Sequence, residues 1–156
     1  MAIQPYATIA FAFDLPIEIP CGTEITVRGP TRNCEYPHTL KLRRRKNGQC
    51  VAVLTDPAND KYEFVIDRKR GKVSLMDAIP WSMEDGEVFA AQMMLIVGEL
   101  VDRLRPSSYS LDEDAAFERD KPLYALIEAG EQRWENERRA VLRLGSLELG
   151  LGEQIH

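Results

Sequence analysis

The spacing of apolar residues along the chain changes near residue 78. Apolar residues recur at every second position over residues 39–77, whereas they recur at helical spacing over residues 78–156. A period of two residues is typical of half-buried strands, and a period near 3.6 is typical of amphipathic helices. The pattern predicts an α+β fold, in which an antiparallel β-meander of about five strands packs against two major C-terminal helices and one short helix.

The first 38 residues predict strands less clearly than the segment that follows. Residues 6–13 alternate up to Pro16, which favours one strand. Residues 17–19 and 25–27 flank a turn-like segment and predict a short strand pair. Residues 29–38 contain Gly-Pro and Tyr-Pro steps, so an irregular loop is expected there.

Asn47-Gly48 marks the first of two predicted hairpins, within residues 39–55. This dipeptide favours the two positive φ angles of a two-residue type I′ turn. Such a turn pairs Lys46 with Gln49. By the same register, Leu42 lies opposite Val53.

The second predicted hairpin covers residues 62–76 and turns through residues 68–71. A four-residue loop closed by Asp67 and Lys72 fits this spacing. The resulting register aligns Ile66 with Val73 and Phe64 with Leu75.

A meander places the turns of both hairpins at the same end of the sheet, where basic side chains converge. We predict that these residues bind a partner with an acidic surface: Arg43, Arg44, Arg45, Lys46, Arg68, Lys69, Arg70 and Lys72. The alternative is that they are solvated turn residues, whose charge discourages aggregation between sheet edges.

The first predicted helix begins at Ser82, which with Asp85 resembles an N-terminal cap. Apolar residues then recur at helical spacing as far as Leu104, before Arg105-Pro106. This helix is expected to cover the sheet, with its methionines in the core. A Met-rich groove for a ligand is the alternative.

A short acidic helix over residues 111–120 and a long last helix over residues 123–144 are predicted next, with Pro122 in the first turn of the latter. In the long helix Ile127, Trp134 and Val141 recur every seven residues and form a narrow apolar stripe along one side. The residues around Trp134, between the members of this stripe, are mostly charged. This stripe either packs within the monomer or pairs with a second copy. We expect a homodimer formed through residues 122–151.

The tail, residues 145–156, alternates leucines with Glu148 and Gly150. Such an extended segment is expected to dock as a strand on its own sheet or on a partner. The predicted oligomerisation residues are Ile127, Trp134, Val141, Leu147 and Leu149.

Composition fits one domain of 156 residues, divided into a β-rich part (1–78), a helical part (79–145) and the apolar-alternating tail (146–156). The net charge of −5 conceals a net +5 over residues 39–77 and a net −8 over residues 78–156. The longest apolar stretch, residues 93–97, is far shorter than the roughly 20 residues of a membrane span. The start lacks a secretory signal and the three cysteines form no disulfide framework, so a cytoplasmic location is expected.

The sequence offers little catalytic chemistry. Its two histidines are His38 and His156. Cys34 and His38 could form a thiolate–imidazole pair, and with Cys21 and Cys50 they could form a zinc site, although no Cys-x-x-Cys spacing is present. The hairpin register also places Arg45 opposite Cys50, which would favour a thiolate there. No catalytic residue, metal ligand or cofactor is assigned.

These features favour a non-enzymatic protein-binding or oligomerising module, of a regulatory or inhibitor type. It would act through the long helix, the apolar tail and the basic sheet edge. One alternative is nucleic-acid or polyanion binding through the basic turns, weakened by the acidic pI near 5.1 and by the lack of aromatic residues among the turns. The other alternative is a small enzyme that uses Cys34 and His38.

Overall fold

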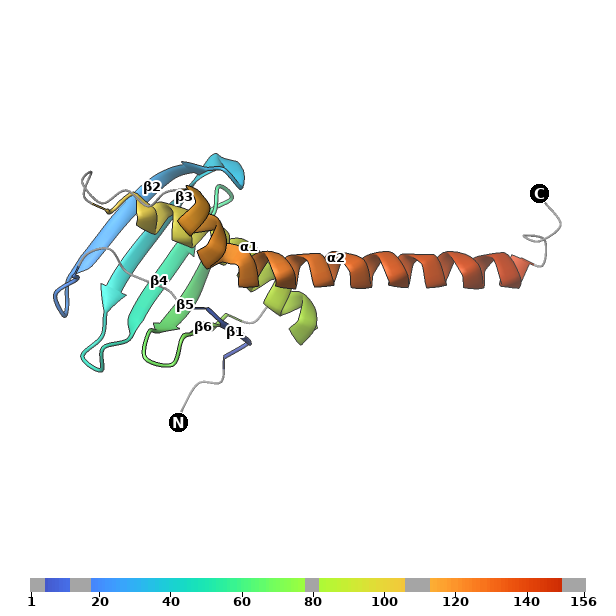
Figure 1. The fold of residues 1–156 in the computed structure, drawn as a ribbon, viewed down its shortest axis with the longest axis horizontal. Coiled ribbons are helices and arrows are strands. Elements are labelled where there is room, and N and C mark those ends of the chain that lie inside the picture. Colours follow the sequence, from blue (N-terminus) through green and yellow to red (C-terminus); the bar gives the residue numbers. More distant parts are fainter. Residues whose placement is uncertain (1–4, 12–17, 78–81, 106–112, 150–156) are drawn as a thin grey trace.

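The computed structural model describes residues 5–11, 18–77, 82–105 and 113–149, which form an antiparallel sheet and two helices (Figure 1). The strands of the sheet are β1 (Ala7–Ala10), β2 (Glu24–Thr31), β3 (Cys34–Arg44), β4 (Cys50–Thr55), β5 (Lys61–Asp67) and β6 (Lys72–Leu75). Their order in space, β1-β6-β5-β4-β3-β2, makes β2 to β6 a meander, with β1 added at the far edge. The α+β class and the antiparallel meander are confirmed, with six strands in place of about five.

The segment predicted as an irregular loop, residues 29–38, belongs instead to β2 and β3. Thr31 pairs with Cys34 across a tight turn, and the pairing continues to Glu24 and Arg43. Pro37 lacks a backbone N–H, but β4 pairs with β3 only from Thr39 onward. Pro37 is therefore tolerated in β3, because no residue of β4 needs a hydrogen bond from it. The Gly-Pro and Tyr-Pro steps therefore mark an edge of the sheet and not a break in it.

The hairpin between β3 and β4 has a longer loop than predicted. Arg45 N donates to Gln49 O at 2.8 Å and Gly48 N donates to Arg45 O at 3.0 Å, which encloses three residues. Gly48 takes a positive φ of 88°, whereas Asn47 does not take a positive φ. This is the three-residue loop with a glycine bulge. The predicted pairing of Lys46 with Gln49 is wrong.

A one-residue shift in register moves every side chain of a strand to the other face of the sheet. In the observed register Leu42 lies opposite Ala52, and Arg44 lies opposite Cys50. Leu42 and Ala52 are fully buried on the same face. The predicted contacts of Leu42 with Val53 and of Arg45 with Cys50 are therefore both wrong. In contrast, the register of β5 with β6 is confirmed, with Ile66 opposite Val73 and Phe64 opposite Leu75.

Helix α1 (Met83–Asp102) covers one face of the sheet. Its N-cap is the predicted Ser82, whose hydroxyl accepts a hydrogen bond from Asp85 N at 3.2 Å. The core between helix and sheet includes Leu40, Leu54, Phe64, Leu75, Met94, Val97 and Leu100, all fully buried. Met94 is thus core filler, as predicted, whereas Met93 is half-buried and lines a surface hollow, and the side chain of Met83 lies outside the described residues. Ile19, predicted in a short strand, lies outside the strands but is 1% exposed within the same core.

Helix α2 (Glu113–Leu149) is one helix of 37 residues, not a short helix followed by a long one. Pro122 lies inside it, where the sequence predicts the start of a new helix. Arg119 lies one turn earlier and bonds both Asp102 Oδ1 at 2.7 Å and Asp120 Oδ1 at 2.9 Å. Burial alone would lower the pKa of Arg119, but these two carboxylates outweigh it and raise the pKa. This ion cluster fixes the turn before Pro122 to the end of α1, which offsets the backbone bond lost at a proline.

The first residues of the predicted tail belong to α2. The α2 helix continues through Leu149, so residues 145–149 are helical and not an extended strand. Alternating leucines over so few residues do not separate a strand from the end of a helix. The side chains of Leu147 and Leu149, and all of Leu151, lie outside the described residues.

Gly130 allows a close approach of α2 to α1, and a substitution there tests this contact. A Cβ there would collide with the side chain of Val88, which is only 2% exposed. We expect Gly130→Ala to lower the free energy of unfolding by roughly 1 kcal/mol, because overpacking outweighs the gain in helix propensity. The measurement is urea unfolding followed by circular dichroism.

The matched control is Gly145→Ala, where an added Cβ meets nothing within 4 Å. This change should not destabilise the protein, and it should increase the helix content. Equal stability of the two variants would contradict the close contact at Gly130.

Candidate functional site

The two helices pack antiparallel, and contacts at both ends define the pairing. Arg119 of α2 reaches Asp102 near the end of α1, while Arg133 reaches Asp85 near its start, in each case at 2.7 Å. Between these ends Leu123 is fully buried and Gly130 faces Val88. Because α1 begins at Met83, it cannot accompany α2 much beyond Trp134.

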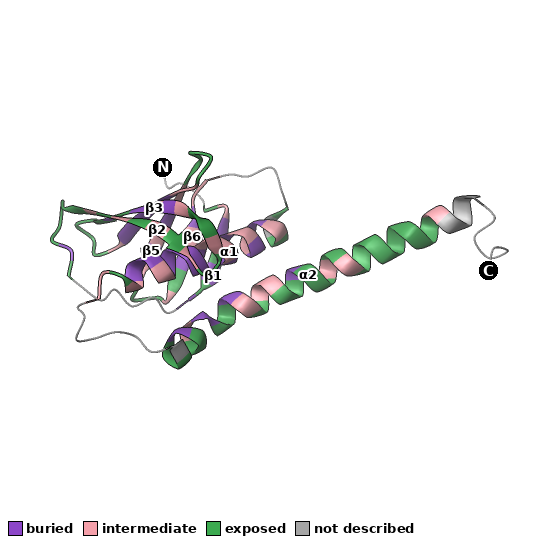
Figure 2. Ribbon diagram, turned by 90° about the horizontal axis from the view of Figure 1, so that it is seen from above, coloured by how far each residue is buried: buried purple, intermediate pink, exposed green. Residues whose placement is uncertain are grey.

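The rest of α2 projects from the sheet and α1, as Figures 1 and 2 show. The whole helix is about 55 Å long at ~1.5 Å per residue. Every residue from 136 to 144 is exposed, and Val141, Leu142 and Leu144 are 67%, 63% and 59% exposed. We call residues 136–149 the projecting segment. Three large apolar side chains on one short stretch of helix are thus left in water.

Polar contacts within α2 support the start of this segment. Glu135 lies 3.4 Å from Arg138 and 3.3 Å from Arg139. Pairs at these spacings stabilise an isolated helix by about 0.2–0.5 kcal/mol each. They add helicity where tertiary packing does not.

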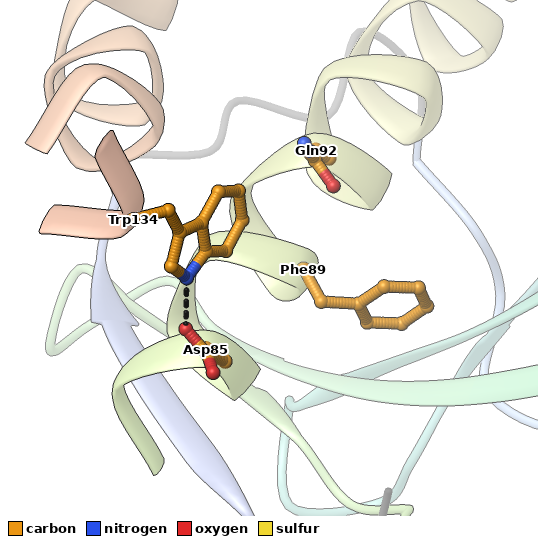
Figure 3. Close-up of a pocket in the computed structure, with 4 residues that line it drawn as sticks. All are labelled: Asp85, Phe89, Gln92 and Trp134. Atoms are coloured by element: carbon orange, nitrogen blue, oxygen red, sulfur yellow. Dashed lines mark hydrogen bonds between the residues drawn. The ribbon is translucent and has the colours of Figure 1, made fainter. Parts of the chain in front are cut away.

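Trp134 and Arg133 form a clamp on Asp85 at the point where α2 leaves the domain. Trp134 Nε1 donates to Asp85 Oδ1 at 2.7 Å, as Figure 3 shows. Arg133 Nη2 donates to the same oxygen, also at 2.7 Å. The hydrogen bonds from Arg133 and Trp134 lower the pKa of Asp85. The clamp therefore fixes the direction in which the projecting segment extends.

A groove runs along the junction of α1 and α2. Its first part is a hollow of about 250 Å³ lined by Asp85, Phe89, Gln92 and Trp134 (Figure 3). Its second part is a hollow of about 430 Å³ lined by Asn33, Cys34, His38, Gln92, Met93, Leu95, Ile96, Tyr124 and Ile127. Gln92 lines both hollows, so they lie next to each other, and we call the two together the groove.

The predicted oligomerisation residues follow this groove and then leave it. Ile127 and Trp134 line it, with Trp134 39% exposed, and Val141 lies on the projecting segment. Sequence reasoning did not find Asp85, Phe89 and Gln92. They form the opposite wall only because α1 and α2 pack antiparallel, and the sole signal was their spacing along one face of a helix.

The structure brings the two basic turns side by side at one end of the sheet. A hollow of about 260 Å³ is lined by Asn47, Gly48 and Gln49 from one turn and by Asp67, Arg68, Lys69 and Arg70 from the other. Arg45 lies 3.6 Å from Glu63, and Arg70 lies 3.6 Å from Asp67. The predicted basic residues outnumber these two carboxylates, so this end of the sheet carries net positive charge.

Cys34 and His38 are not brought together as a catalytic pair. Both lie in β3, where four residues span about 13 Å, beyond hydrogen-bond reach. The His38 ring is buried, and its Nδ1 lies 3.2 Å from Tyr36 O. Because a carbonyl oxygen only accepts, Nδ1 carries the proton in this contact. The Cys34–His38 mechanism lacks the geometry that it requires.

The cysteines likewise do not converge on a metal. Cys21 is exposed, Cys34 half-buried and Cys50 buried, and all three are free thiols. Within the described ranges, no group of three or more His, Cys, Asp or Glu side chains could hold a metal ion. Burial raises the pKa of the Cys50 thiol, which disfavours the reactive thiolate.

No helix in the described part of the chain is both long enough and apolar enough to cross a membrane. Comparison with known proteins found no matching protein family, no matching curated protein and no matching solved structure.

The clamp at Asp85 predicts a dependence of stability on pH. A lowered carboxyl pKa stabilises the folded state above the unfolded pKa, near 3.9, and this contribution is lost as pH falls through the folded pKa. We expect Asp85→Asn to lower the melting temperature at neutral pH, because the charged acceptor for Arg133 and Trp134 is removed. The difference from wild type should shrink below about pH 4. Melting followed by circular dichroism measures both.

Glu84→Gln is the control, because Glu84 also contacts Arg133, at 3.4 Å, but its side chain is 71% exposed. It should change the melting temperature little. An Asp85→Asn protein as stable as wild type at neutral pH would show that the clamp does not hold α2.

Proposed function

We propose that this chain is a non-enzymatic protein-binding module, whose projecting segment packs against a helix of another protein chain. The observation that carries the proposal is the exposure of Val141, Leu142 and Leu144 on a helix that continues past its supporting helix. Burying such a side chain in an interface contributes about 1.5–3 kcal/mol. The isolated chain does not gain this stabilisation while these side chains remain in water. A preformed helix with an apolar side is a common recognition element.

The groove along α1 and α2 supports the proposal from the receiving side. It offers apolar walls from Phe89, Met93 and Ile127, interrupted by polar groups such as Gln92. A helix laid in a groove of this kind buries its apolar face and leaves its polar face in water.

We propose further that the partner carries an acidic surface, because the basic turns would attract it. Charge complementarity chiefly raises the rate of association and excludes partners of the wrong sign. The proposal includes a cytoplasmic location, which the three free thiols support. A regulatory or inhibitory role would follow if the partner is an enzyme.

A second candidate is nucleic-acid or polyanion binding through the basic turns. The hollow that joins Arg68, Lys69 and Arg70 to the Asn47-Gly48 turn favours it, because one surface then presents several cations to a chain of phosphates. The acidic remainder of the chain opposes it.

The proposal is tested with Val141→Lys/Leu142→Lys, because both side chains are exposed and their loss costs the folded monomer little. Trp134 is unsuitable, since it also holds α2 to Asp85. The helical partner, whether a different chain or a second copy, should bind the double variant at least tenfold more weakly, because about 1.4 kcal/mol or more of burial is lost. Isothermal titration calorimetry measures the Kd.

Asn136→Lys is the matched control, because it adds a charge to the same exposed part of α2 but lies about 140° around the helix from Val141. It should bind as wild type does. If no chain from the host, and no second copy, binds in a way that depends on Val141 and Leu142, the proposal is wrong.

Salt dependence separates the two candidates. We expect binding of generic DNA or RNA to be weak and to vanish near about 0.15 M salt, because the acidic helices repel the polymer. Fluorescence anisotropy across a salt series measures this. Arg44→Glu/Arg45→Glu/Arg68→Glu/Arg70→Glu should instead slow association with an acidic protein partner. Tight nucleic-acid binding that survives at that salt, and is abolished by the four changes, would make the second candidate correct.

A further inference from the structure

We propose that the partner of the projecting segment is a second copy of this chain. The two α2 helices would run antiparallel, centred on Trp134, so that the projecting segment of each copy lies in the α1–α2 groove of the other. This inference rests on the proposed function and specifies its partner.

The groove has the form that a third helix requires. On α1 its wall includes Asp85, Phe89, Gln92 and Ile96, which follow one face of the helix over three turns. On α2 the facing wall includes Tyr124, Ile127 and Trp134. Figure 3 shows the Trp134 indole reaching from α2 to Asp85, with Phe89 and Gln92 lining the same hollow.

The walls are held in place by contacts outside the groove, so the groove is preformed. Arg32 N, in the turn beside Asn33 and Cys34, donates to both carboxylate oxygens of Glu99, at 3.0 and 2.9 Å. Arg119 ties the start of α2 to Asp102. A preformed groove lowers the entropy cost of binding.

The seven-residue stripe continues from the groove onto the projecting segment. Ile127, Trp134 and Val141 lie on one side of α2, seven residues apart on either side of Trp134. An antiparallel pair centred on Trp134 therefore sets Ile127 of each copy opposite Val141 of the other. Ile127, which is half-buried in the groove, and Val141, which is exposed beyond it, then bury each other.

The lengths also match. From Trp134 to Leu149 the helix extends about 22 Å, and the part of α2 that lines the groove, from Trp134 back to Tyr124, extends about 15 Å. The projecting segment is long enough to fill the groove of a second copy.

Charge favours the antiparallel register. Glu131 and Arg138 lie on the same side of α2 as the stripe and at nearly equal distances from Trp134. In the antiparallel pair, a twofold axis passes between the two Trp134 residues. It places Glu131 of each copy beside Arg138 of the other, which gives two attractive contacts. The contacts are reciprocal and use all of the stripe, so the assembly closes as a dimer.

Charge reversal tests this register. Glu131→Arg alone and Arg138→Glu alone each place like charges at both contacts, and each should raise the dimer Kd about tenfold or more. The double variant Glu131→Arg/Arg138→Glu restores opposite charges and should return the Kd to within a few-fold of wild type. Sedimentation equilibrium measures the Kd, and circular dichroism checks the fold of every variant.

Arg139→Glu is the matched control. Arg139 contacts the same Glu135 as Arg138 does, but it points away from the stripe. This variant should dimerise as wild type does. A double variant that stays as weak as the single variants would overturn the register.

Cysteine cross-linking tests the orientation, in a Cys34→Ser background because Cys34 lines the groove. Under mild oxidation, Ile127→Cys/Val141→Cys should form covalent dimers and Val141→Cys alone should not. Efficient cross-linking of Val141→Cys alone would show a parallel pair and overturn the antiparallel arrangement.

A wild-type chain that stays monomeric at high micromolar concentration would overturn the inference of a second copy. It would leave the proposed function standing if a different chain binds in a way that depends on Val141 and Leu142. The two failures are therefore distinguishable.

Discussion

The antiparallel packing of α2 on α1 is the constraint on which the functional surfaces depend. It is fixed at two separated points, by Arg119 on Asp102 and by Arg133 and Trp134 on Asp85. A rigid helix held at two points has one direction, so the residues after Trp134 must project. The same packing creates the groove, because its two walls come from different helices. The clamp, the groove and the projecting segment thus have a single physical origin.

The sequence predicted the sheet well where loop length and hydrophobic pattern agreed. The closing pair Asp67 and Lys72 fixed a four-residue loop, and the observed register follows it. At Asn47-Gly48 the predicted loop length and the hydrophobic pattern disagreed, because this dipeptide suits both a two-residue turn and a three-residue loop with a glycine bulge. Only the longer loop puts Leu42 and Ala52 on the same buried face. The burial of a whole strand outweighs the preference of one turn, so the hydrophobic pattern was the better guide.

Prediction of the helices failed where a local signal met a tertiary contact. Pro122 resembles the first turn of a new helix, but the ion cluster of Arg119 holds the helix continuous through it. The stripe of Ile127, Trp134 and Val141 was visible because it depends on one helix alone. The groove was not visible, since Phe89 and Gln92 become its wall only when α2 lies beside α1.

The separation of charge along the chain becomes a separation in space. The basic turns lie at the end of the sheet between β3 and β4 and between β5 and β6, while α2 extends away from the sheet in another direction (Figure 1). A partner helix on the projecting segment would therefore leave the basic turns open. An acidic protein bound at the turns would add little repulsion at the stripe, because solvent-exposed charges more than about 10 Å apart are largely screened at moderate salt. In the proposed dimer built on α2, the two surfaces would therefore be occupied independently, and the basic end of each copy would still be free to select an acidic partner.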